Sequence, residues 1–179
     1  MRWLAQALRD DPRTTVQMLV TGTHLDPSHG ETWREIEQDG FAIDARAAAP
    51  LTGDTPLHVV SAMGRATEEI GRALDALKPD LVVILGDRYE MLAAASAALV
   101  LRLPIAHLHG GELTEGAFDD AIRHAITKIA HLHFAAAESY ARRIVQLGED
   151  PDHVFCVGAP GLDALVHEPT LSRDALAET

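Results

Sequence analysis

Residues 81–85 read LVVIL, an unbroken apolar run that is followed directly by Gly86 and Asp87. A strand with one face in water alternates apolar and polar residues, whereas a parallel strand covered on both faces is apolar throughout. We therefore expect residues 81–85 to form a central strand of a parallel sheet that carries helices on both faces.

Apolar runs and helical patterns alternate along the rest of the chain. We expect further strands at 16–20, 41–45, 104–107, 132–136 and 154–157, and helices at 32–38, 56–77, 89–102, 118–130, 138–147 and from 162 onwards. This order is typical of a parallel sheet with helices on both faces. The chain has 179 residues and no internal repeat or linker, so it is predicted to form a single Rossmann-like α/β domain over residues 1–179.

Charge and cysteine content exclude several classes of protein. The net charge of −12 opposes the many phosphate contacts of nucleic-acid binding, but it still allows a small anionic ligand. The one cysteine, Cys156, cannot form an intramolecular disulfide, and we expect it to be buried in its apolar strand. We find no membrane-spanning run and no signal-peptide pattern, so a cytoplasmic protein without membrane contact is expected.

The polar residues that follow the apolar runs are the first candidates for a site, because ligands in such sheets bind beyond the carboxyl ends of the strands. One such segment runs from Thr21 to His24. Asp87 follows the most apolar run, either as a carboxylate aimed into a cleft or as the N-cap of the next helix. Position alone leaves both interpretations open.

Residues 107–112 read HLHGGE. The period of a strand places His107 and His109 on the same side of its end, and the two glycines allow a sharp turn or a close approach to a ligand. With Glu112 the histidines also suggest zinc, but the spacing matches no specific zinc motif, and no metal is expected. A turn with partly buried histidines is the plainer alternative.

Asp119 and Arg123 are four residues apart and therefore share one helix face. They form either an ordinary surface ion pair or part of a site. Histidine is also unusually frequent, since seven of the ten lie between His107 and His167. Together with the carboxylates, these side chains predict acid–base chemistry with several proton carriers.

The segments GDRYEMLAAA at 86–95 and PIAHLHGGELTEGAFDDAIRHAITKIAHLHF at 104–134 resemble the hydrolysing UDP-N-acetylglucosamine 2-epimerases of sialic acid biosynthesis. LVTGTHL at 19–25 and RRIVQLGEDPDHVFCVGAPGLDAL at 142–165 agree with this family. The resemblance covers nearly the whole chain, and the block at 104–134 is long and specific.

The resemblance implies the N-terminal half of a two-domain, GT-B-like fold whose active site lies between the domains. The chain would then lack the first strand and the second domain, and it would carry part of the site. The implied reaction is anti elimination of UDP from UDP-N-acetylglucosamine and hydration of the glycal to N-acetylmannosamine. The implied ligand is a UDP-sugar, no metal or redox cofactor is needed, and we expect the full-length protein to be a homo-oligomer.

The resemblance also assigns site residues. Asp87, Asp119 and Arg123 match family residues around the sugar and the leaving diphosphate. Some members carry a functional Glu where this chain has His109, so we expect His109 and Glu112 both to line the site. The catalytic candidates are Asp87, His109, Glu112 and Asp119, and the substrate-binding candidates are His24, Arg88, His107, Arg123, His131 and His133.

Two alternatives stay open. Similar epimerases of legionaminic-type sugar synthesis act on a UDP-2,4-diacetamido-trideoxyhexose, and the motifs in this half do not separate the two substrates. The chain could also be a non-catalytic sugar-nucleotide-binding domain.

Overall fold

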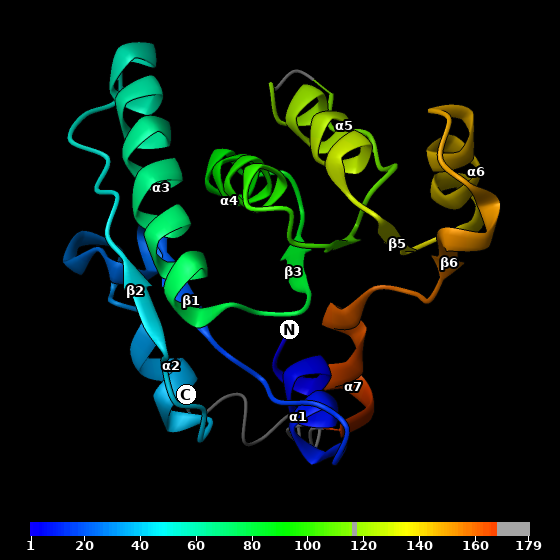
Figure 1. The fold of residues 1–179 in the computed structure, drawn as a ribbon, viewed down its shortest axis with the longest axis horizontal. Helices are drawn as coiled ribbons and strands as arrows, with labels where there is room; N and C mark the ends of the chain where they lie inside the picture. The colour runs from blue at the N-terminus through cyan, green and yellow to red at the C-terminus, as the bar shows by residue number, and fades with distance from the viewer. Residues whose placement is uncertain (116–117, 168–179) are drawn as a thin grey trace, which may run out of the picture.

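The computed structural model describes residues 1–115 and 118–167, which form an α/β fold with two parallel sheets (Figure 1). β1 (Leu19–Thr21) pairs with β2 (Ala45–Ala47). The larger sheet has the order β3-β4-β5-β6, with strands β3 (Val82–Leu85), β4 (Ile105–Leu108), β5 (Leu132–Ala135) and β6 (Val154–Cys156). Every pair is parallel, which confirms the Rossmann-like α/β class.

Helices alternate with the strands as the sequence predicts. They are α1 (Arg2–Asp10), α2 (Trp33–Gln38), α3 (Pro56–Leu77), α4 (Tyr89–Val100), α5 (Asp119–Ile129), α6 (Glu138–Gln146) and α7 (Asp163–His167), with 3₁₀ turns at Gly22–Leu25, Pro27–His29, Pro151–His153 and Pro160–Leu162. In Figure 1, α3 to α6 stand in a row on one side of the strands, and α1, α2 and α7 lie on the other. Within the described ranges, no helix has the length and apolar character needed to cross a membrane.

The long helix α3 begins and ends where the sequence predicts. The Thr55 hydroxyl accepts a hydrogen bond from the His58 N–H, and Pro56 supplies a fixed φ at the first helical position. Lys78 ends the helix in the left-handed conformation, with a φ of +49°, and its N–H donates to the Leu74 carbonyl.

β1 and β2 begin later than the predicted strands at 16–20 and 41–45. The Asp44 carboxylate accepts a hydrogen bond from the Met18 N–H at 2.7 Å, and the Met18 carbonyl accepts from both Asp44 and Ala45. These bonds precede the regular ladder, which starts with Leu19 opposite Ala45.

The most enclosed strand is β4, in which all four residues are buried. β3 pairs only with β4 among the described strands, and Val83 is 38% exposed. The expectation that residues 81–85 form a strand covered on both faces is therefore wrong. Cys156 was predicted to be buried and is exposed, because β6 lies at the other edge of the sheet, where it pairs with β5 alone among the strands in residues 1–115 and 118–167.

Alanines allow α3 and α4 to pack closely against each other in the core. Ala62 and Ala66 on α3, and Ala95 and Ala98 on α4, have no exposed surface. Such small side chains allow the two helices to approach closely. Because protein interiors are packed about as densely as organic crystals, little space is left there for a larger side chain.

We predict that Ala98→Leu lowers the free energy of unfolding by about 1–3 kcal/mol, because three extra heavy atoms must displace close-packed neighbours. Urea unfolding followed by circular dichroism measures the change. Val100→Leu on the same helix is the control, because Val100 is 81% exposed and its replacement should change stability by less than about 0.5 kcal/mol. Equal stability of the two variants would contradict this packing.

Candidate active site

The carboxyl end of β3 turns sharply at Gly86, which has a φ of +83°, and the chain then reaches Asp87 and Arg88. Arg88 is the N-cap residue of α4, and it makes no side-chain capping bond. Asp87 lies outside the helix and forms an ion pair with Arg123 on α5. The helix-cap interpretation of Asp87 is therefore wrong, and its carboxylate faces the end of the neighbouring strand.

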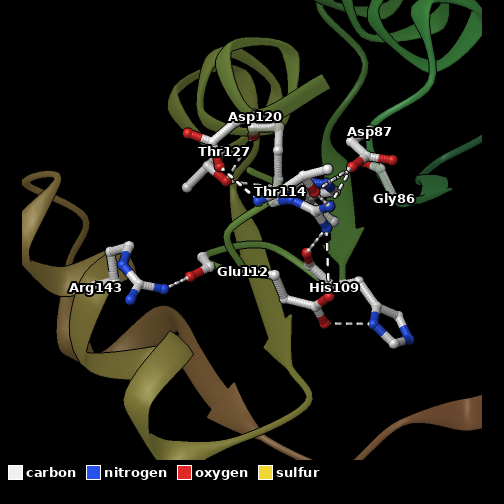
Figure 2. A network of polar contacts seen from close by, with 11 residues as sticks. Gly86, Asp87, His109, Glu112, Thr114, Asp120, Thr127 and Arg143 are labelled. Carbon is white, nitrogen blue, oxygen red and sulfur yellow. Dashed lines mark hydrogen bonds and ion pairs between the residues drawn. The ribbon is translucent and has the colours of Figure 1, made fainter. Parts of the chain in front are cut away.

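Arg123 is the centre of a polar network that joins three elements. Figure 2 shows this network, with Asp87, His109, Glu112 and Thr114 labelled. Its Nη2 contacts the Asp87 carboxylate and donates to the Thr114 hydroxyl at 2.9 Å. Its Nη1 donates to the His109 carbonyl at 2.9 Å and lies 3.5 Å from Glu112 Oε2. Arg123 is only 6% exposed, so the interpretation of Asp119 and Arg123 as a surface ion pair is wrong.

The turn after β4 places His109 and Glu112 side by side. His109 Nδ1 and Glu112 Oε1 are 2.5 Å apart, and both side chains are about a quarter exposed. His109 has a φ of +62°, a conformation that costs energy in a non-glycine residue and often occurs at functional sites. The two groups can share a proton next to the buried arginine.

Helix α6 fixes this turn from outside the site. A side chain at Gly111, which has a φ of +75°, would collide with the carbonyl of Tyr140. Arg143 of α6 donates a hydrogen bond to the Gly111 carbonyl. Gly111 is therefore required because the backbone of α6 lies so close to it. The close approach to a ligand that the sequence also suggested is not needed to explain this glycine.

His107 lies beneath this network, and its side chain has no exposed surface. Its Nε2 is 2.9 Å from the Gly86 carbonyl, which can only accept, so the ring donates from Nε2. Thr127 Oγ1 lies 3.3 Å from the other ring nitrogen. Burial lowers the pKa of His107 to about 4, so the ring is neutral near pH 7. His107 stabilises the turn at Gly86 through this hydrogen bond. Unlike His109, it does not reach the surface.

His131 and His133 lie away from the carboxyl edge. His131 precedes β5, at the amino end of the strand, where its Nδ1 accepts a hydrogen bond from the Ile105 N–H. His133 is buried within β5, 3.3 Å from Glu149 Oε2, and burial lowers its pKa. His131 thus lies at the opposite end of its strand from the candidate site, and His133 is buried beside His107 in the adjacent strand.

Arg88 lies at the carboxyl edge, and its side chain is 59% exposed. The carboxylate of Glu90 hydrogen-bonds this guanidinium and raises its pKa, and Asp119 is close enough to contribute to the same shift. His24 follows β1 and its Nδ1 is 2.6 Å from the Thr32 hydroxyl. Sequence analysis did not identify Thr114 or Glu90 as candidate site residues. Glu90 could have been noticed, because it lies in the first turn of the helix that follows Asp87.

The described residues contain no group of three histidine, cysteine or acidic side chains placed to hold a metal ion. His109 and Glu112 supply two such groups, and the adjacent cation is the Arg123 guanidinium. The arrangement suits proton transfer, in which a base and its orienting partner lie within hydrogen-bond distance.

Comparison with known proteins decides the family. A family model described as UDP-N-acetylglucosamine 2-epimerase matches residues 6–179. The chain belongs to the UDP-N-acetylglucosamine 2-epimerase family. Asp87, Arg88, His109, Glu112 and Arg123 all lie within the matched range.

Three curated relatives of this epimerase family cover most of the chain. The GDP/UDP-N,N'-diacetylbacillosamine 2-epimerase (hydrolyzing) of Campylobacter jejuni is 44% identical over 89% of this chain and 41% of its own length. The UDP-N,N'-diacetylbacillosamine 2-epimerase (hydrolyzing) of Legionella pneumophila is 39% identical over 97% of this chain and 46% of its own length. The UDP-N-acetylglucosamine 2-epimerase of Neisseria meningitidis is 32% identical over 96% of this chain and 44% of its own length. The chain spans less than half the length of these relatives.

A solved structure of an epimerase of this family has the same fold. The crystal structure of the UDP-GlcNAc 2-epimerase from Neisseria meningitidis bound to UDP-GlcNAc matches with a TM-score of 0.77 and 20% identity. The match covers 93% of this chain and 45% of that one. This likeness confirms the Rossmann-like fold and its relation to about half of a GT-B-like epimerase.

We predict that His107 makes the fold acid-sensitive. The unfolded chain binds a proton on this ring below about pH 6.5, whereas the folded protein does so only near pH 4. Stability is therefore lost as the pH falls between these values, by about 3 kcal/mol in total. The ionisable groups that act on His107 are His133, Arg123 and Asp87.

Chemical unfolding at a series of pH values measures this dependence. His107→Gln should lose less stability than the unmodified protein between pH 6.5 and 4, whatever its absolute stability. His29→Gln, at an exposed residue, is the control and should keep the original slope. Equal slopes for all three proteins would show that His107 does not cause the acid sensitivity.

Proposed function

We propose that this chain supplies part of the active site of a hydrolysing 2-epimerase that acts on a nucleoside-diphosphate-linked 2-acetamido sugar. The observation that carries the proposal is the carboxyl edge of the sheet. There an exposed cation, Arg88, adjoins the Asp87 carboxylate, and the His109–Glu112 pair lies on the other side of buried Arg123.

The proposed reaction has two steps. A base removes the proton from C2 of the sugar, and the C1–O bond breaks with its electron pair passing to the nucleoside diphosphate. The resulting glycal has a double bond between C1 and C2. Water then adds its hydroxyl to C1, and C2 receives a proton from the opposite face, which inverts that carbon.

Each step needs a proton carrier, and the site offers two. The His109–Glu112 pair is hydrogen-bonded and partly exposed, as a group that exchanges protons with a substrate must be. The Asp87 carboxylate is partly exposed and is fixed in direction by Arg123. Asp119 lies close enough to Arg88 to contribute to its raised pKa, and we propose that Asp119 lines the same site.

Arg88 is the group proposed to bind the diphosphate. A guanidinium presents parallel N–H donors that match phosphate oxygens and keeps its charge at every physiological pH. His24 lies in the turn after β1, which begins with Gly22 beside Glu90, and we propose that it extends the binding surface. Buried Arg123 has a different role, because both of its terminal nitrogens, Nη1 and Nη2, already donate to protein groups.

The relatives favour a diacetamido sugar as the substrate. Both relatives named for N,N'-diacetylbacillosamine are more similar to this chain than the Neisseria relative named for UDP-N-acetylglucosamine. The UDP-2,4-diacetamido-trideoxyhexose alternative is therefore preferred over conversion of UDP-N-acetylglucosamine to N-acetylmannosamine, which stays the second candidate. The Campylobacter name includes both GDP and UDP, so we extend the proposal to either nucleotide.

We predict that the full-length protein, incubated in D2O with UDP-N,N'-diacetylbacillosamine, releases UDP together with the C2 epimer carrying deuterium at C2. Proton NMR follows both products, and a parallel reaction with UDP-N-acetylglucosamine should be slower.

Asp87→Asn should reduce the rate by about a hundredfold or more, because it removes a proton carrier. Glu138→Gln, at an exposed helix start, should leave the rate unchanged.

Other outcomes separate the alternatives. Turnover of UDP-N-acetylglucosamine alone would establish the second substrate. Saturable binding of both nucleotide sugars without release of UDP would replace the enzyme with a binding domain.

A further inference from the structure

Glu90 is a buried carboxylate that the proposed chemistry does not use. It lies in the first turn of α4 and is 3% exposed. A charged side chain at such a position is costly unless it is paired, because burial removes its hydration. The contacts of Glu90 therefore indicate what the residue does.

The partner of Glu90 is the arginine two residues earlier. Arg88 donates from Nε to Oε2 at 3.2 Å and from Nη2 to Oε1 at 3.0 Å. These two bonds engage one edge of the guanidinium, while the Arg88 side chain as a whole is 59% exposed. A long side chain that is free to rotate loses conformational entropy when it binds a ligand, and a chain already fixed at one edge loses less.

A third group fixes Glu90 itself. Gly22, at the end of β1, has a φ of +63°, and a Cβ at this position would lie 2.6 Å from Glu90 Oε1. The carboxylate thus lies against the backbone that follows the two-stranded sheet, and it bonds a residue that follows the four-stranded sheet. It has little room to move away from Arg88.

We infer that Glu90 is a positioning residue for Arg88. Its carboxylate holds the Nε–Nη2 edge of the guanidinium, so that the remaining donors are presented to the diphosphate of the substrate. The inference rests on the proposed function, because it takes the ligand of Arg88 to be a nucleoside diphosphate.

A purely structural role for Glu90 makes a different prediction. An acidic residue in the first turn stabilises a helix through its dipole, and this effect changes stability and not the affinity for a ligand. Glu138 also lies in the first turn of its helix, α6, and is exposed, so Glu138→Gln removes a helix-start charge without touching Arg88.

The test is a double-mutant cycle in the full-length protein, with UDP binding measured by calorimetry and KM and kcat measured by UDP release. Arg88→Gln and Glu90→Gln should each raise the Kd for UDP and the KM by about tenfold, with a much smaller change in kcat. The double variant should bind no more weakly than Arg88→Gln, because Glu90 acts through Arg88. Glu90→Asp should recover part of the affinity, and Glu138→Gln should bind normally.

Thermal melting separates folding from binding. If Glu90→Gln fails to fold, Glu90→Asp takes its place in the cycle, and the same non-additivity is expected. Unchanged UDP affinity in a folded Glu90 variant, or additive effects in the double variant, would overturn the inference alone. If the unmodified protein itself does not bind UDP, the proposed function fails, and the inference fails with it.

Discussion

The buried guanidinium of Arg123 is the group on which the candidate site depends. An arginine that is 6% exposed keeps its charge, and the terminal nitrogens of its guanidinium therefore require acceptors. It finds them in the Asp87 carboxylate after β3, in the His109 carbonyl after β4 and in the Thr114 hydroxyl of the following loop. Because Arg123 itself belongs to α5, this one side chain fixes the ends of two strands relative to a helix.

The two arginines of the site have different surroundings and therefore different uses. Arg123 is enclosed, and its two terminal nitrogens donate to groups within the protein. Arg88 is open to solvent, and the carboxylate of Glu90 holds one edge of it. His107 is a third support, because its neutral ring bonds the Gly86 carbonyl just before Asp87. The exposed Arg88 and the proton carriers are thus held in place by the buried side chains of Glu90, His107 and Arg123.

The order of elements could be predicted from the sequence, because apolar runs and helical periods reflect local burial. The degree of burial could not, since it depends on neighbours: the apolar run at 81–85 forms an edge strand, while β4 is fully enclosed. The polar residues that follow the strands were the predicted site candidates, and the structure places two of them, Asp87 and Glu112, beside Arg123. The partner of Arg123 was missed, because helical spacing points to Asp119 and the actual acceptor is 36 residues away in sequence. His131 was a binding candidate through the family resemblance, yet the direction of its strand places it at the opposite edge.

The central claim is that the carboxyl edge of this sheet forms one side of a nucleotide-sugar site. A crystal structure of the full-length protein with UDP bound tests it most directly. The diphosphate should lie within hydrogen-bond distance of the Arg88 guanidinium, with Asp87 and His109 facing the sugar and Glu90 still bonded to Arg88. A diphosphate bound elsewhere on the chain, with Arg88 directed into solvent, would contradict it.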